Sequence, residues 1–239
     1  MDPGFGFAAL IGIAPAMILM YAVLRKYTYP AVERPFFSDP YFFGLFVVGM
    51  ISGTVLFAVY TYFWGNVVLN AILFGILEVM VLLVILNLRR FHGKSDTVFY
   101  GYGLGLGFGA TASVGMIFFL TNAASSLDGA MTVTDYIFLI VYTVSKTMII
   151  SSLGLTVGEG VARLRILEFT AQAIFMNMIF HLLLVPWFMN PEAYTGILGM
   201  AAALILASFY LYKTAFSDLP KVVRDVLRQE GIRRDDIPK

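Results

Sequence analysis

Three ionisable side chains lie inside long apolar stretches of this sequence. Glu78 belongs to the stretch 66–88, and Lys146 and His181 belong to two later ones. A charge near the middle of a membrane costs roughly 2.5–3.5 kcal/mol, so such residues usually face the interior of a helix bundle. A carboxylate can activate water, and a histidine can bind a metal or stabilise an oxyanion. A buried ammonium needs a carboxylate or several carbonyls as its partner.

The depth of these residues places them in one layer. At about 1.5 Å of rise per residue, Glu78 and Lys146 lie roughly 18 Å from the outer ends of their helices, and His181 roughly 12 Å. Asn177, one turn from His181, and Ser113 belong to the same layer. We expect this intramembrane polar centre to be either a structural contact between helices, with Glu78 paired to Lys146, or a functional site.

Seven apolar stretches are each long enough to cross a bilayer as a helix, which takes about 20 residues. They lie at 5–24, 40–64, 66–88, 97–121, 134–157, 166–189 and 193–213. The sequence therefore predicts an all-α fold, a polytopic membrane helix bundle with seven transmembrane helices. Residues 1–216 form this seven-span transmembrane domain, with the lipid bilayer as its surroundings.

The composition excludes several classes of function. Of all residues, 59% are hydrophobic and only 13% are charged, against about 25% charged in soluble domains. A soluble enzyme could not keep its surface hydrated with so few charges, and a nucleic-acid binder needs a basic excess. Cysteine is absent, which removes disulfides, thiolate metal sites and cysteine nucleophiles.

Basic residues predict the orientation. Fifteen of the 16 Lys and Arg residues fall in the first, third and fifth loops and in the tail, and Lys146 is the exception. Because basic loops stay in the cytoplasm, we expect the N-terminus outside and the C-terminus in the cytoplasm. We expect the plasma membrane as the location.

The stretch 97–121 contains glycine at every second position from Gly101 to Gly109. This period-two pattern is typical of a strand in water, but a lone strand in lipid would leave its backbone unpaired. As a helix, Gly101, Gly105 and Gly109 form overlapping GxxxG spacings that let neighbouring helices approach closely. We expect a central helix surrounded by protein.

Residues 217–239 form a separate cytoplasmic tail. Apolar residues from Leu219 to Leu227 recur at helical spacing, with charged residues on the opposite face. This pattern predicts a short amphipathic helix, which lies either on the membrane surface or against the intracellular loops.

Asp96 to Phe108, read as D-x-h-h-Y-G-x(4)-L-G-F with h apolar, resembles the fourth-span motif of PrsW-type intramembrane proteases. Their superfamily includes the CAAX-processing endopeptidases and the APH subunit of γ-secretase. The resemblance covers roughly residues 66–190, and it implies catalytic roles for Glu78 and His181. Gly154 and Gly158 keep the spacing of two helix-packing glycines in the family motif.

The departures from the family motif concern its chemistry. Ala112 and Ser113 replace a Glu-Asn pair, and Lys146 replaces a histidine. A cation repels a divalent metal instead of binding it, so we expect no metal and no cofactor. The seven spans and the segment from His181 to Pro191 are closer to the APH branch, which has lost proteolytic activity and serves as a scaffold.

The sequence therefore favours a non-catalytic membrane scaffold or subunit. It would bind another integral membrane protein, such as a membrane protease or its substrate, through the glycine-rich central helix. The alternative is an active PrsW-type intramembrane protease that uses Glu78 and His181. A transporter or channel would need a polar track along several helices, and the sequence shows a single layer. A retinal protein is disfavoured because Lys213 lies at the end of the last span.

Overall fold

The computed structural model describes residues 3–63, 65–126, 132–190, 193–232, 234 and 236–238. Within this part the chain is helical and contains no strand. The elements are α1 (Pro3–Leu24), α2 (Asp39–Tyr62), α3 (Val67–Leu86), the 3-10 turn η1 (Arg89–Phe91), α4 (Thr97–Ser126), α5 (Val133–Ala162), α6 (Ile166–Met189), α7 (Tyr194–Leu211), the π-helical segment η2 (Tyr212–Asp218) and α8 (Leu219–Gln229).

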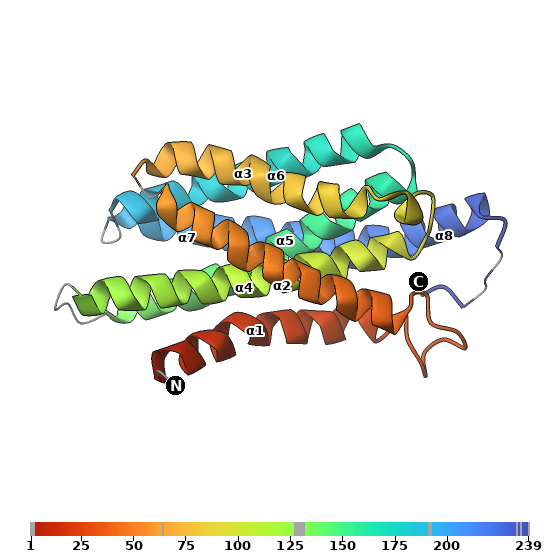
Figure 1. Cartoon of the computed structure of the whole chain (residues 1–239), viewed down its shortest axis with the longest axis horizontal. Helices are drawn as coiled ribbons and strands as arrows, with labels where there is room; N and C mark the ends of the chain where they lie inside the picture. Colours follow the sequence, from red (N-terminus) through yellow and green to blue (C-terminus); the bar gives the residue numbers. More distant parts are fainter. Residues whose placement is uncertain are drawn as a thin grey trace.

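Seven of these helices are long and apolar enough to cross a membrane among the residues that are described. They lie side by side along one axis (Figure 1), and the predicted membrane helix bundle is confirmed at this level. α4 and α5 have 30 residues each and exceed the predicted spans because their polar ends continue the helix beyond the apolar stretch. Trp64, the predicted end of the second span, and the tail residues Arg233 and Lys239 lie outside the described residues.

α4 and α5 form the centre of the bundle. Both are more buried than the other spans, and α4 packs chiefly against α5, α2 and α1. The glycine-rich stretch is helical as predicted. Its helical form satisfies the backbone groups that a strand would expose to lipid.

One glycine face of α4 fits against α5. A Cβ atom added at Gly105 would lie only 2.5 Å from the backbone oxygen of Ile150, and one at Gly109 would lie 2.9 Å from the Cα of Thr147. At Gly101 it would collide with the carbonyl oxygen of Gly154. Hydrogen in place of a side chain therefore lets the two backbones touch.

The other glycine face of α4 fits against α2. A Cβ atom at Gly107 would collide with the carbonyl oxygen of Phe46, and one at Gly53 of α2 would lie 2.5 Å from that of Phe108. Both faces are thus covered by helices of the same chain. The sequence predicts that the glycine-rich helix holds a partner protein; in the structure these glycine positions are filled by helices of the same chain.

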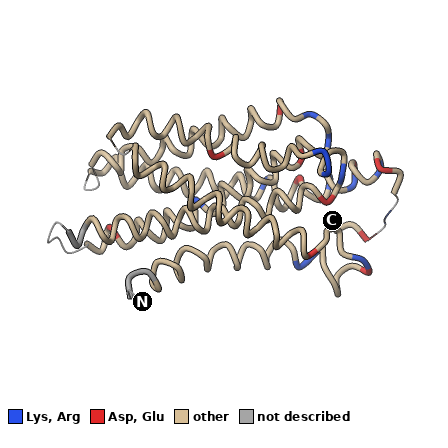
Figure 2. Tube along the Cα trace, viewed as in Figure 1, with Lys and Arg blue, Asp and Glu red and all other residues tan. Residues whose placement is uncertain are grey.

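Lys and Arg residues gather at one end of the bundle (Figure 2). This end carries the α1–α2, α3–α4 and α5–α6 connections together with α8, whereas α1 begins at the opposite end (Figure 1). Asp96 lies here, directly before α4. Burial raises the pKa of its carboxyl group above the ordinary value, against the opposing effect of a hydrogen bond with Tyr100.

After α7 the helix continues through η2 into α8, which lies at this charged end (Figure 1). The apolar side chains of α8, among them Leu219, Val223 and Val226, are buried within the protein. Arg163 at the end of α5 forms an ion pair with Asp225 at 3.0 Å.

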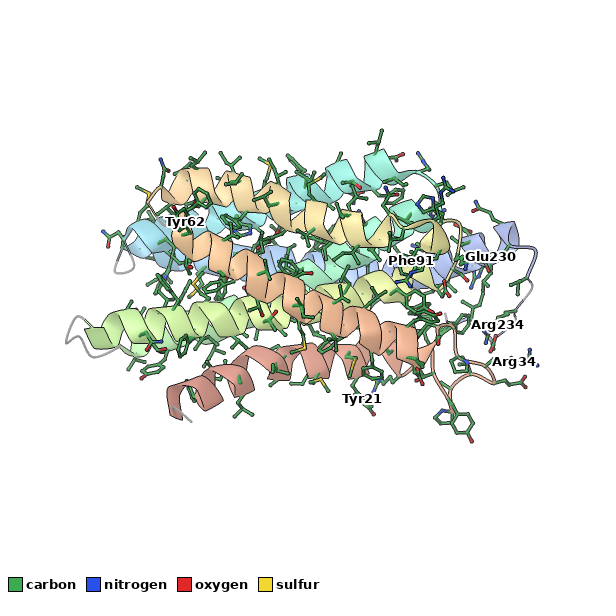
Figure 3. All side chains as sticks on the ribbon, in the orientation of Figure 1. Tyr21, Arg34, Tyr62, Phe91, Glu230 and Arg234 are labelled. Carbon is green, nitrogen blue, oxygen red and sulfur yellow. The ribbon has the colours of Figure 1, made fainter. Side chains whose placement is uncertain are left out.

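Beyond α8, the tail is bonded to two loops. The Glu230 carboxylate accepts a hydrogen bond of 2.6 Å from the backbone N–H of Ser95. Arg234 donates to the carbonyl of Arg34 at 2.6 Å and lies 3.8 Å from the centroid of the Phe36 ring. Figure 3 shows Arg34 and Arg234 close together at this end. The tail therefore links α8 to both the α1–α2 and α3–α4 connections.

Candidate functional site

Three helices carry the polar residues to the middle of the bundle. Glu78 lies near the centre of α3, Lys146 near the centre of α5, and Asn177 and His181 one turn apart on α6. α6 packs against both α3 and α5. Their convergence lets residues separated by up to 103 positions meet.

The Glu78–Lys146 ion pair that the sequence predicts is confirmed and direct. The lysine Nζ lies 2.6 Å from Oε1 and 2.7 Å from Oε2 of the glutamate. Only 1% of Lys146 and 5% of Glu78 is exposed. Such burial makes each charge dependent on the other, because a lone ion would lose its hydration without compensation.

His181 completes a triangle with this pair. Its Nε2 lies 3.1 Å from Nζ of Lys146 and 3.1 Å from Oε2 of Glu78. A lysine ammonium has three hydrogens and no acceptor, and here it has three acceptors in reach: the two carboxylate oxygens and the imidazole nitrogen. The single Nε2 either accepts from Lys146, when the ring hydrogen is on Nδ1, or donates to Glu78, when it is on Nε2.

Asn177 supports the carboxylate from the same helix as His181. Its Nδ2 donates to Oε2 of Glu78 and to the backbone oxygen of Gly75, both at 3.0 Å. Since both neighbours are acceptors, the orientation of the amide is fixed. Its Oδ1 is buried without a hydrogen-bond partner in the described part of the chain. Asn177 therefore orients Glu78 at the cost of one unsatisfied oxygen.

Ser113 is not joined to this group. Its hydroxyl donates at 2.7 Å to the carbonyl of Gly109 in its own helix, which is the usual way a serine bonds within an apolar helix. Its neighbour Ala112 instead contributes to the wall of the cavity beside the cluster. The structure thus brings together Glu78, Lys146, His181 and Asn177 of the five expected polar residues.

A small cavity adjoins the cluster. Glu78, Lys146 and His181 line one part of it, and apolar and aromatic side chains such as Tyr142 line the rest. The space open to the centre of a water molecule is about 20 Å³, which is room for about one water. Tyr142, one turn from Lys146 on α5, also lines this cavity; its helical spacing from Lys146 is the signal in the sequence that points to this position.

The two glycines expected from the family motif lie where α5 meets α4. A Cβ atom at Gly154 would collide with the carbonyl of Gly101, and one at Gly158 would lie 3.0 Å from that of Thr97. Both are therefore packing positions.

The donor set around the cavity suits an ion pair and not a cation site. In the described ranges, no three side chains of His, Asp or Glu lie close enough together to hold a metal ion. The ammonium of Lys146 lies within 3.1 Å of both Glu78 and His181, and a cation there repels a divalent metal.

Comparison with protein-family models, with curated proteins and with solved structures found no match to this chain.

Proposed function

We propose that this chain is a non-catalytic integral membrane subunit, a scaffold that binds another membrane protein and belongs to the superfamily of PrsW-type proteases and APH subunits. The observation that carries the proposal is the bonding of Lys146. Its ammonium donates to both carboxylate oxygens of Glu78 and lies 3.1 Å from Nε2 of His181. A scaffold needs such a centre only to hold its helices together.

Glu78 is poorly suited to activate water in this arrangement. Its Oε1 accepts from Lys146, and its Oε2 accepts from Lys146 and Asn177. Three of the roughly four acceptor sites of the carboxylate are then occupied, and a proton taken up by Glu78, as a general base must do, would break its ion pair with Lys146. The ion pair therefore favours a structural role for the carboxylate.

The partner would contact the outer faces of the bundle. Glycine positions of α4 are covered by α5 and α2, so they shape the scaffold from within. The partner would contribute a membrane-spanning segment, which would take the place of lipid against the outer helices.

Isolation of the intact chain from its native membranes in mild detergent tests the scaffold. We expect one integral membrane protein to be recovered at a fixed molar ratio. Recovery should persist for a Glu78→Leu/Lys146→Met double variant, which lacks the cluster but keeps its volume. If no other membrane protein is recovered with the chain in any of the detergents tested, the proposal is contradicted.

A second candidate function is an intramembrane protease of the PrsW type. The observation in its favour is the cavity beside Glu78 and His181, with room for about one water. This function predicts cleavage of a transmembrane peptide by the purified protein in nanodiscs, and loss of that cleavage in Glu78→Gln. We expect no difference between the parent and this variant.

The proposed orientation places the charged end in the cytoplasm and the start of α1 outside, in the plasma membrane. It is supported by the gathering of basic residues at one end (Figure 2). The chain has no cysteine, so single cysteines can be introduced without background. Lys94→Cys should react with an impermeant thiol reagent only from the cytoplasm, and Val133→Cys, at an exposed position, only from outside. Reaction of both from one side would contradict the orientation.

A further inference from the structure

A groove lies between α1 and α2 at the charged end of the bundle. It shares no lining residue with the cavity beside the polar cluster. Both helices pack on α4 rather than closely on each other. The groove has a volume of about 670 Å³. Its apolar lining includes the buried residues Leu24, Phe37 and Phe42.

Two opposite charges stand on the lining of this groove. Arg25 follows the last residue of α1, and Asp39 is the first residue of α2. Both are exposed, and neither forms an ion pair with any residue that the structure describes. The guanidinium of Arg25 instead lies 5.9 Å from the centroid of the Tyr21 ring, and Tyr21 itself lines the groove. Figure 3 labels Tyr21 on α1, toward the charged end.

The location of the groove matches the headgroup level of a bilayer. α1 and α2 are membrane-spanning candidates, and the groove lies where one ends and the other begins. Exposed tyrosines, Tyr21 and Tyr29, border it, as expected where aromatic rings meet lipid headgroups. An occupant with an apolar chain and a polar head would therefore be oriented correctly.

We propose that this groove binds a phospholipid whose headgroup carries a phosphate and a primary ammonium, as in phosphatidylethanolamine. Arg25 binds the phosphate oxygens through its planar donors. Asp39 accepts hydrogen bonds from the ammonium, which a choline headgroup cannot donate. The apolar lining, which includes the buried Phe42, contacts the acyl chain. An anionic lipid such as phosphatidylglycerol would offer Asp39 only neutral hydroxyl donors in place of an ammonium.

Native mass spectrometry of the full chain in detergent tests this inference. The protein is titrated with phosphatidylethanolamine, phosphatidylcholine or phosphatidylglycerol, and the Kd of the first bound lipid is compared. We expect phosphatidylethanolamine to bind about tenfold more tightly than the other two, the effect of one charge-assisted hydrogen-bonded contact. Equal or tighter binding of phosphatidylglycerol would overturn the proposal.

Two variants separate the two charges. Arg25→Gln should weaken all three lipids by about tenfold, whereas Asp39→Asn should remove the preference for phosphatidylethanolamine and leave phosphatidylcholine unchanged. The matched controls are Lys26→Gln and Glu33→Gln, which alter exposed charges of the same region that do not line the groove. If the control variants change lipid binding as much as Arg25→Gln and Asp39→Asn do, the change reflects general surface charge. That result would contradict a specific site.

A competition on the parental protein avoids dependence on the folding of any variant. Soluble glycerophosphoethanolamine should displace the bound lipid headgroup at lower concentration than glycerophosphoglycerol. The reverse order, or no displacement by either compound, would contradict the assignment of the groove.

Discussion

Two regions hold the middle of this bundle together by opposite means. Along α4, helices meet because side chains are missing, as at Gly105 against Ile150. Between α3, α5 and α6, helices meet through charged and polar side chains that reach 2.6–3.1 Å from one another. The first region stabilises the bundle through van der Waals contact between backbones. The second stabilises it through electrostatic attraction between groups that are almost fully shielded from water.

The difference concerns what each region tolerates. A close backbone contact has no room for any added atom, but it needs no chemical partner. A buried ion pair depends wholly on its partner, yet both partners can be replaced together by apolar groups of similar volume. Pairs of variants therefore distinguish the two regions.

The largest effect is expected from Lys146→Met. It leaves the Glu78 carboxylate buried without its cation, and breaking a buried pair in this way costs about 3–5 kcal/mol. Reversible unfolding in mixed micelles with increasing denaturing detergent measures the change. Lys213→Met, at an exposed position, is the control and should alter stability by less than about 0.5 kcal/mol.

The double variant Lys146→Met/Glu78→Leu should regain most of that loss, because neither ion is then stranded. The same unfolding measurement checks it. If the double variant is as unstable as Lys146→Met alone, the cluster stabilises the bundle by its shape. That result would contradict the claim that electrostatic attraction holds α3, α5 and α6 together.

Gly105→Leu should have the next largest effect, a loss of about 1–3 kcal/mol or more from overpacking against backbone. The matched control is Gly44→Leu in α2, where an added Cβ meets nothing within 4 Å. Thermal unfolding in detergent compares the two. Equal stability of the two variants would show that α4 and α5 can separate without cost.

Asp96→Asn should have the smallest effect, under about 1 kcal/mol for a partly exposed group. Burial raises the pKa of Asp96 in the folded state, so its contribution to stability is fully present below the unfolded pKa and is lost as the pH rises through the folded pKa. The variant should therefore equal the parent in acid and be slightly more stable at neutral pH. A parent that gains relative stability with rising pH would contradict this sign.

The two regions also differ in how far the sequence predicts them. Spacing alone predicts the glycine contacts of Gly101, Gly105 and Gly109, since a fixed rise and turn put them on one face. The identity of the ion pair follows from the cost of a lone charge in lipid. Depth counted along each helix placed His181 about 6 Å from the level of Lys146, yet the long lysine side chain reaches it at 3.1 Å.

Other details depend on tertiary packing that no local pattern contains. Nothing in the sequence indicates that Gly75 offers its carbonyl to Asn177. The bond from Arg234 to Arg34 spans 200 positions and depends on how the chain turns back after α8 (Figure 1).

The order of synthesis gives the buried ion pair a further consequence. Lys146 follows Glu78 by 68 residues, which a ribosome adds in about 3–14 s at roughly 5–20 residues per second. During that interval α3 exists without its cation, and an ionised carboxylate in lipid would cost roughly 2.5–3.5 kcal/mol. This cost falls on α3 until α5 arrives, unless the carboxyl group enters protonated or α3 waits at the insertion machinery. The third helix is therefore the step of assembly at which the insertion of this chain is most costly.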